Sequence, residues 1–138
     1  DILDVTGHKP SYPLIGDKFL EVSKLYRMLP SSLNATYEGR TPLDNQTVRN
    51  VFIIDPNKKI KLILAYPMST GRNFQEILRV VDSLQLTDEY KVATPADWKQ
   101  GEDVIIVPAV KDEEAKKIFP GGWNAKKPYL RVVKNPKS

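Results

Sequence analysis

The 138-residue sequence contains no cysteine and one histidine, His8. Without cysteine, the chain can supply no disulfide, no thiolate nucleophile and no cysteine-ligated zinc site. A single histidine makes a Ser-His-Asp triad or a two-histidine metal site hard to assemble. His8 lies between Gly7 and Pro10, where a solvated loop is expected. Nucleophilic or metal-dependent catalysis within this chain is therefore disfavoured.

Long apolar stretches are also missing, since runs such as residues 51–54 are far too short to span a bilayer. Hydrophobic residues make up 41% of the chain and charged residues 28%, as in an ordinary globular protein of about one domain. The net charge is +4, but the 21 basic residues are mixed with 17 acidic ones. The aromatic residues are dispersed rather than interleaved with the lysines. We therefore expect neither a nucleic acid nor a membrane as partner.

The clearest local structure is a β-hairpin. Residues 48–54 and 60–66 are rich in β-branched and apolar side chains, and Asp-Pro-Asn-Lys at 55–58 is typical of a turn. The continuous apolar stretch of the first strand favours a central strand with a helix over it. Before the hairpin, residues 1–16 are expected to be extended or looped. A helix capped by Asp17 is then expected to run to Pro30.

A second helix is predicted after the hairpin, because Asn73 and Glu76 have the spacing of a capping box. Its apolar stripe is expected to pack against the hairpin and consists of Phe74, Ile77, Leu78, Val81 and Leu84. Further on, the pattern predicts a strand at 103–107, a helix at 112–119 and a strand at 129–133. This order of elements is typical of an α/β or α+β protein.

Two parts of the sequence are candidates for binding chemistry: Arg49, and the segment Thr70-Gly71-Arg72. Arg49 is a cation within an apolar strand, so it needs a carboxylate or a ligand as partner, or a position at the end of the sheet. Thr70-Gly71-Arg72, before the capped helix, could hold an anion on backbone N–H groups and a guanidinium. The residues alone leave these alternatives open.

Much of the chain resembles the later half of a one-cysteine peroxiredoxin. The resemblance begins with TVRNVFIIDPNKK at 47–59 and LAYPMSTGRNF at 64–74. It continues in order, with family-like spacing, through residues 76–79, 82–87, 92–95, 97–98, 101–103 and 129–133. The resemblance implies an α/β fold: residues 1–87 as the C-terminal part of a thioredoxin-like domain, and residues 88–138 as a small α+β extension.

The same resemblance implies a function. In this family a cysteine thiolate attacks hydrogen peroxide or an organic hydroperoxide and becomes a sulfenic acid, which an external thiol reduces, and no cofactor is needed. The segment that carries the cysteine is expected to lie in an N-terminal half absent from this chain, so the chain alone is expected to be inactive. Arg49 matches the arginine beside the catalytic sulfur, and Arg72 matches a second, supporting arginine of the active site.

The expected partners are a peroxide, a thiol reductant, the N-terminal half of the same protein and a second copy in a homodimer. We also expect a cytoplasmic protein that serves cell redox homeostasis. Residues 88–138 are expected to form a dimerisation arm without a core of its own, whose aromatic residues Trp98, Trp123 and Tyr129 are buried against another surface. The alternative function is a non-catalytic module, a truncated peroxiredoxin that serves dimerisation or binding.

Overall fold

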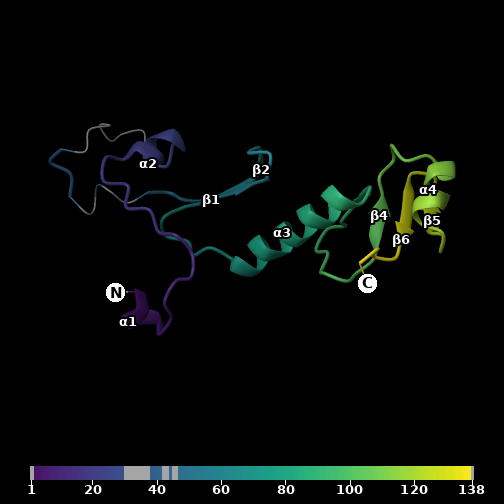
Figure 1. Cartoon of the computed structure of the whole chain (residues 1–138), viewed down its shortest axis with the longest axis horizontal. Coiled ribbons are helices and arrows are strands. Elements are labelled where there is room, and N and C mark those ends of the chain that lie inside the picture. Colours follow the sequence, from purple (N-terminus) through teal and green to yellow (C-terminus); the bar gives the residue numbers. More distant parts are fainter. Residues whose placement is uncertain (1, 30–37, 42–43, 45–46, 138) are drawn as a thin grey trace. The chain divides into compact units, whose positions relative to one another are not determined.

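The computed structural model describes residues 2–29, 38–41, 44 and 47–137. The chain forms two compact units, residues 1–72 and residues 73–138, each of which contains helices and an antiparallel sheet (Figure 1). No helix of the described part is long and apolar enough to cross a membrane. The mixture of helices and sheets agrees with the expected α/β class.

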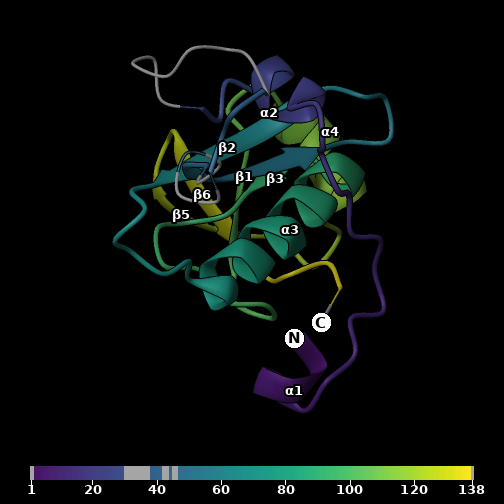
Figure 2. The same cartoon turned by 90° about the vertical axis from the view of Figure 1, so that its left-hand side faces the viewer.

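The first unit is built on the predicted hairpin, which is confirmed. Strand β1 (Arg49–Ile54) pairs antiparallel with β2 (Ile60–Tyr66) (Figure 2). Arg49, the first residue of β1, lies opposite Tyr66. Asp55 organises the turn: its carbonyl oxygen accepts from the backbone N–H of Lys58 at 2.9 Å, and its carboxylate accepts from that of Lys59 at 2.8 Å.

The expected central position of β1 is wrong for the part of the chain that the structure describes, where β1 pairs with β2 alone. The side chains in the middle of β1 are half-buried, whereas Ile60 and Ile63 of β2 are exposed. A continuous apolar run shows that a strand is suited to burial on both faces, but it does not identify what covers those faces.

The first unit also contains two short helices, α1 (Ile2–Thr6) and α2 (Glu21–Leu25). The sequence did not predict α1, which buries none of its residues. The helix predicted from Asp17 to Pro30 is much shorter than expected, because Leu20 and Arg27 have left-handed φ values of 59° and 51° and so bound it on both sides.

The N-cap residue of α2 is Leu20 rather than Asp17, but Asp17 binds the first turn of the helix. Its carboxylate accepts hydrogen bonds from the backbone N–H groups of Val22 and Ser23, at 3.1 and 2.7 Å, and from the Ser23 hydroxyl at 2.7 Å. The Ser23 hydroxyl is the main reason why the pKa of Asp17 is lowered. The end of α2 meets the hairpin where the rings of Tyr26 and Phe52 make an edge contact, 4.7 Å between centroids.

The second unit begins with helix α3 (Phe74–Glu89), whose predicted cap is confirmed: Asn73 accepts from the backbone N–H of Glu76 at 3.2 Å. The Glu76 carboxylate binds Arg79 instead of closing a capping box. Phe74 and Leu78 of the apolar stripe are 66% and 57% exposed. That this stripe packs against the hairpin stays a prediction.

The sheet of the second unit has the order β3-β4-β6-β5, with antiparallel neighbours. Its strands are β3 (Val92–Ala93), β4 (Val104–Ile106), β5 (Asn124–Lys127) and β6 (Leu130–Val133), and helix α4 (Asp112–Ile118) lies between β4 and β5 in the chain. The predicted strands at 103–107 and 129–133 and the helix at 112–119 are confirmed. Strands β3 and β5 were not predicted: the first has two residues, and the second is polar and exposed throughout.

The expectation that residues 88–138 lack a core of their own is wrong. Trp98 is 2% exposed, and Val104 and Ile106 of β4 are fully buried beside it in one hydrophobic cluster with Leu86 of α3 and Phe119. Trp123 is half-buried against this cluster, and Tyr129, in the turn between β5 and β6, is 69% exposed. The boundary expected between residues 87 and 88 stays a prediction.

Candidate functional site

Arg49, the residue singled out by the sequence, lies at the end of its strand. It is the first residue of β1, its side chain is exposed, and its Nη1 donates a hydrogen bond to the carbonyl oxygen of Thr70 at 3.3 Å. Of the alternatives that the sequence left open, the position at the sheet end is the one observed. No carboxylate lies within ion-pair distance of Arg49 among the described residues.

Thr70 belongs to the loop that leaves β2. Its backbone N–H donates to the carbonyl oxygen of Pro67 at 2.9 Å and closes a turn, and its own carbonyl oxygen receives Arg49. Because this N–H already has a partner within the chain, it does not serve the expected anion site. The hairpin register, which places Arg49 opposite Tyr66, brings the guanidinium to the start of this loop.

Arg72 ends the same loop and is exposed. In the part of the chain that the structure describes, its side chain has no hydrogen bond or ion pair, so no direct link between the two guanidinium groups is observed. One loop of the first unit therefore relates the two predicted arginines: it anchors Arg49 through the carbonyl oxygen of Thr70, and it contains Arg72, whose side chain has no hydrogen bond among the described residues.

The guanidinium of Arg49 has N–H donors that no hydrogen bond within the described residues uses. A guanidinium carries five N–H donors in a planar fork, and one hydrogen bond of Arg49 is used for positioning. The remaining donors can bind two oxygen atoms of one ligand, and the fixed positive charge favours a thiolate over a thiol in its vicinity. The sheet end can therefore bind an oxygen-rich or anionic group.

The sequence reasoning missed Asn50, the neighbour of Arg49 in β1. Its side-chain oxygen is buried and has no hydrogen-bond partner within the described residues. A buried acceptor without a donor costs free energy, so it marks a place where the surroundings of the hairpin matter. A polar residue inside the apolar strand was the available signal.

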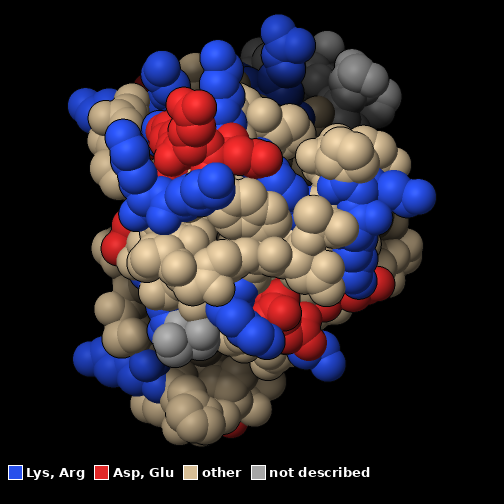
Figure 3. Space-filling model, turned by 90° about the vertical axis from the view of Figure 1, so that its right-hand side faces the viewer, with Lys and Arg blue, Asp and Glu red and all other residues tan. Residues whose placement is uncertain are grey.

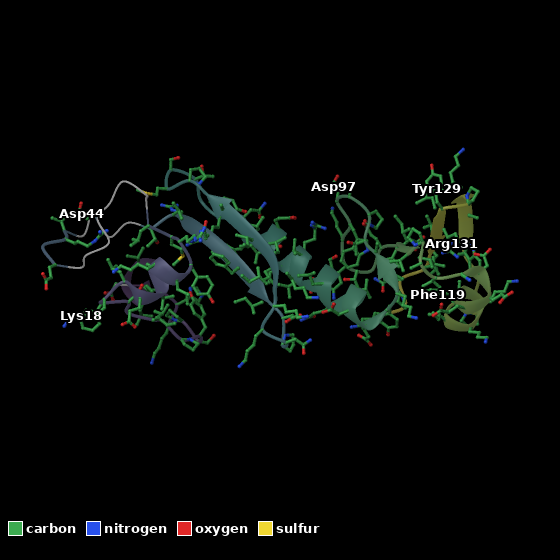
Figure 4. All side chains as sticks on the ribbon, turned by 90° about the horizontal axis from the view of Figure 1, so that it is seen from above. Lys18, Asp44, Asp97, Phe119, Tyr129 and Arg131 are labelled. Carbon is green, nitrogen blue, oxygen red and sulfur yellow. The ribbon has the colours of Figure 1, made fainter. Side chains whose placement is uncertain are left out.

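The sequence analysis also missed Arg131. The argument that a buried cation in an apolar strand needs a partner applies to Arg131 better than to Arg49. Arg131 lies in β6 and is 5% exposed (Figure 4). Its Nη1 donates to Asp112 Oδ1 at 2.6 Å. Its Nη2 donates to the carbonyl oxygens of Val107 and Val110 at 3.2 and 2.6 Å. Arg131 thus has a structural role, as the fork that holds the β4–α4 connection to β6.

His8 and many of the remaining charged residues are exposed, whereas others, such as Asp55 and Asp82, are partly buried. His8 Nδ1 donates a hydrogen bond to the Thr6 carbonyl oxygen at 2.7 Å. In the second unit, Lys91 pairs with Glu114 at 2.5 Å and Lys134 with Asp103 at 3.1 Å, and acidic side chains lie among basic ones on the face in Figure 3. Within the described ranges, no three His, Asp or Glu side chains gather as a metal site would require.

The chain is similar to known proteins over nearly its whole length. It is 48% identical over 136 residues to the 1-Cys peroxiredoxin of Dictyostelium discoideum and 47% identical over 133 residues to peroxiredoxin-6 of Homo sapiens. Residues 83–122 match the model of the C-terminal domain of 1-Cys peroxiredoxin. The chain belongs to the one-cysteine peroxiredoxin family.

Solved structures agree with this assignment. The structure of a yeast mitochondrial 1-Cys peroxiredoxin matches with a TM-score of 0.83 and 46% identity, and covers 96% of this chain and 61% of that chain. A cysteine-to-serine variant of peroxiredoxin 6 of Arenicola marina matches with a TM-score of 0.80 and 44% identity. This match covers 99% of this chain and 63% of the Arenicola chain. The chain spans 53% of the Dictyostelium protein and 57% of the human one.

Proposed function

We propose that this chain is the C-terminal part of a thiol-dependent peroxidase that reduces hydrogen peroxide and organic hydroperoxides. The family supports this activity, and the free donors of Arg49 are the single observation within the chain that carries it. The chain supplies no cysteine, so the nucleophile belongs to an N-terminal half of the same protein. The chain without that half is inactive.

In the proposed reaction, a cysteine thiolate attacks one peroxide oxygen. The S–O bond forms as the O–O bond breaks, and the leaving oxygen takes a proton and departs as water or an alcohol. Negative charge grows on the two oxygens in the transition state, where donors fixed in advance are worth most. Arg49, held by Thr70, supplies such donors and lowers the pKa of the cysteine thiol.

Arg72 has a supporting role in this proposal. It follows Thr70 by two residues, and its guanidinium, unlike that of Arg49, has no hydrogen bond among the described residues. A second cation there strengthens the positive potential around the thiolate and the peroxide. We expect it to contribute less than Arg49, which alone is fixed by a hydrogen bond.

An external thiol then reduces the sulfenic acid, without a cofactor. The structural work on the yeast mitochondrial relative concerns resolution by glutathione and thioredoxin systems, which is consistent with a thiol reductant here. The protein is proposed to act as a homodimer, in which residues 88–138 contact the partner, and to serve cell redox homeostasis in the cytoplasm.

A second candidate is a non-catalytic module for dimerisation or binding. The hydrophobic core of the second unit favours it, because a stable fold with an exposed aromatic residue, Tyr129, can bind a partner without any catalytic group.

The mass of the intact protein in its source separates these candidates. A species larger than 15.7 kDa, with a cysteine-containing peptide and thiol-dependent peroxide turnover, is the result expected for the peroxidase. A lone species of 15.7 kDa without turnover would overturn the peroxidase assignment and favour the module.

A further inference from the structure

The sulfur chemistry of this chain is confined to two methionines. The sequence contains no cysteine, and its methionines are Met28 and Met68. A methionine thioether is oxidised by peroxides to a sulfoxide, and a reductase can reverse the reaction. The accessibility of the two sulfur-bearing side chains therefore decides where the chain itself reacts with a peroxide.

The surroundings of the two methionines differ. Met68 is 40% exposed and lies within the turn that the Thr70 N–H closes on Pro67. Met28 is half-buried where α2 leads toward the hairpin; its backbone N–H donates to Ser23 at 2.8 Å, and its carbonyl oxygen accepts from Val48 at 2.9 Å. Folding thus leaves the Met68 side chain more open to solvent than that of Met28.

We propose that Met68 is a site of oxidation to the sulfoxide by hydrogen peroxide or a small organic hydroperoxide. The thioether sulfur attacks the protonated peroxide oxygen, and the S–O bond forms as the O–O bond breaks. The proton of the attacked oxygen passes to the other oxygen, which leaves as water or an alcohol. Sulfur is oxidised by two electrons, the peroxide is reduced, and no further reactant is needed.

Met68 is close in the chain to the residue that anchors Arg49. It lies two residues before Thr70, whose carbonyl oxygen anchors Arg49, so a peroxide drawn to Arg49 also comes near this turn. This part of the argument rests on the proposed function. The hydrogen bond that closes the turn joins backbone groups, and Met68 is already 40% exposed, so the fold tolerates a polar sulfoxide there.

Peptide mapping by mass spectrometry tests the proposal on the native protein, exposed to hydrogen peroxide without any thiol. The expected result is that Met68 gains one oxygen atom several times faster than Met28, that the two rates converge in denaturant, and that Met68→Leu removes the fast reaction. A native Met28 rate equal to or above that of Met68 would overturn the proposal. Thiol-dependent turnover, measured separately, reports on the proposed function, because oxidation of Met68 needs no thiol and stops at one oxygen per side chain.

Discussion

Arg131 and Asp112 are joined by a 2.6 Å hydrogen bond between Nη1 and Oδ1, which links the third strand of the second sheet to the first residue of α4. The two partners differ in burial, since 6% of the Arg131 side chain is exposed but 68% of that of Asp112. The buried guanidinium also binds two carbonyl oxygens of the β4–α4 connection, at Val107 and Val110. Its main role is therefore to satisfy buried backbone acceptors.

Replacing Arg131 by Leu should destabilise the second unit strongly. The substitution leaves the Val107 and Val110 carbonyl oxygens without this donor, and an orphaned buried polar group costs about 1–3 kcal/mol. Urea unfolding followed by tryptophan fluorescence measures the loss. The control is Asp112→Asn, which should cost clearly less because that side chain is mostly in water. Equal losses for the two variants would contradict the proposed role.

The pair of Glu89 and Lys137 should make the C-terminal segment sensitive to pH at both ends of the range. Hydrogen bonding to Lys137 lowers the pKa of Glu89 below its ordinary 4.5, and the same bond raises the pKa of Lys137 above 10.5. The Glu89 contribution to stability is therefore present above 4.5 and lost as the pH falls through the lowered pKa. The Lys137 contribution is present below 10.5 and lost as the pH rises through the raised pKa.

Carboxypeptidase digestion across the pH range measures this effect, corrected for enzyme activity on an unstructured peptide. Release of residues 135–138 should be slowest between the two pKa values. Glu89→Gln should speed release there and flatten the profile. An unchanged profile in that variant would show that the 2.5 Å ion pair does not hold the segment.

Tyr129 should contribute to the proposed homodimer. It is 69% exposed in the turn between β5 and β6, and exposed aromatic side chains are frequent anchors of protein interfaces. Tyr129→Ser should raise the dimer dissociation constant in sedimentation by about tenfold. Lys126→Ser, in the neighbouring exposed strand, is the matched control. Unchanged dimerisation in the Tyr129 variant would exclude this turn from the interface.

Local patterns predicted most of the regular structure. The hairpin, the Asn73 cap and the positions of β4, α4 and β6 follow from turn residues, capping residues and short apolar runs that act within a few residues. The length of α2 could not be predicted, because the left-handed backbone at Leu20 and Arg27 interrupts a helical apolar spacing. The core around Trp98 was missed because its members come from short elements spread over residues 86–133.

In the candidate site, too, local patterns could be predicted, whereas features that depend on distant residues could not. A cation in an apolar strand drew attention to Arg49, but that pattern does not tell a strand end from a strand interior, and the buried arginine is Arg131. The anchor of Arg49 on Thr70 depends on the hairpin register, which pairs Arg49 with Tyr66. Register is a property of two strands together, so it required the structure.

The most direct test of the account is the rate of peroxide reduction by Arg49→Lys in the intact, cysteine-containing protein. Lysine keeps the charge but loses the planar fork, so stopped-flow measurements should show a second-order rate lower by roughly 10²–10³, with little change in the melting temperature. Arg72→Lys should lose less. A normal peroxide rate in an Arg49→Lys protein of lowered thermal stability would contradict the catalytic role of Arg49.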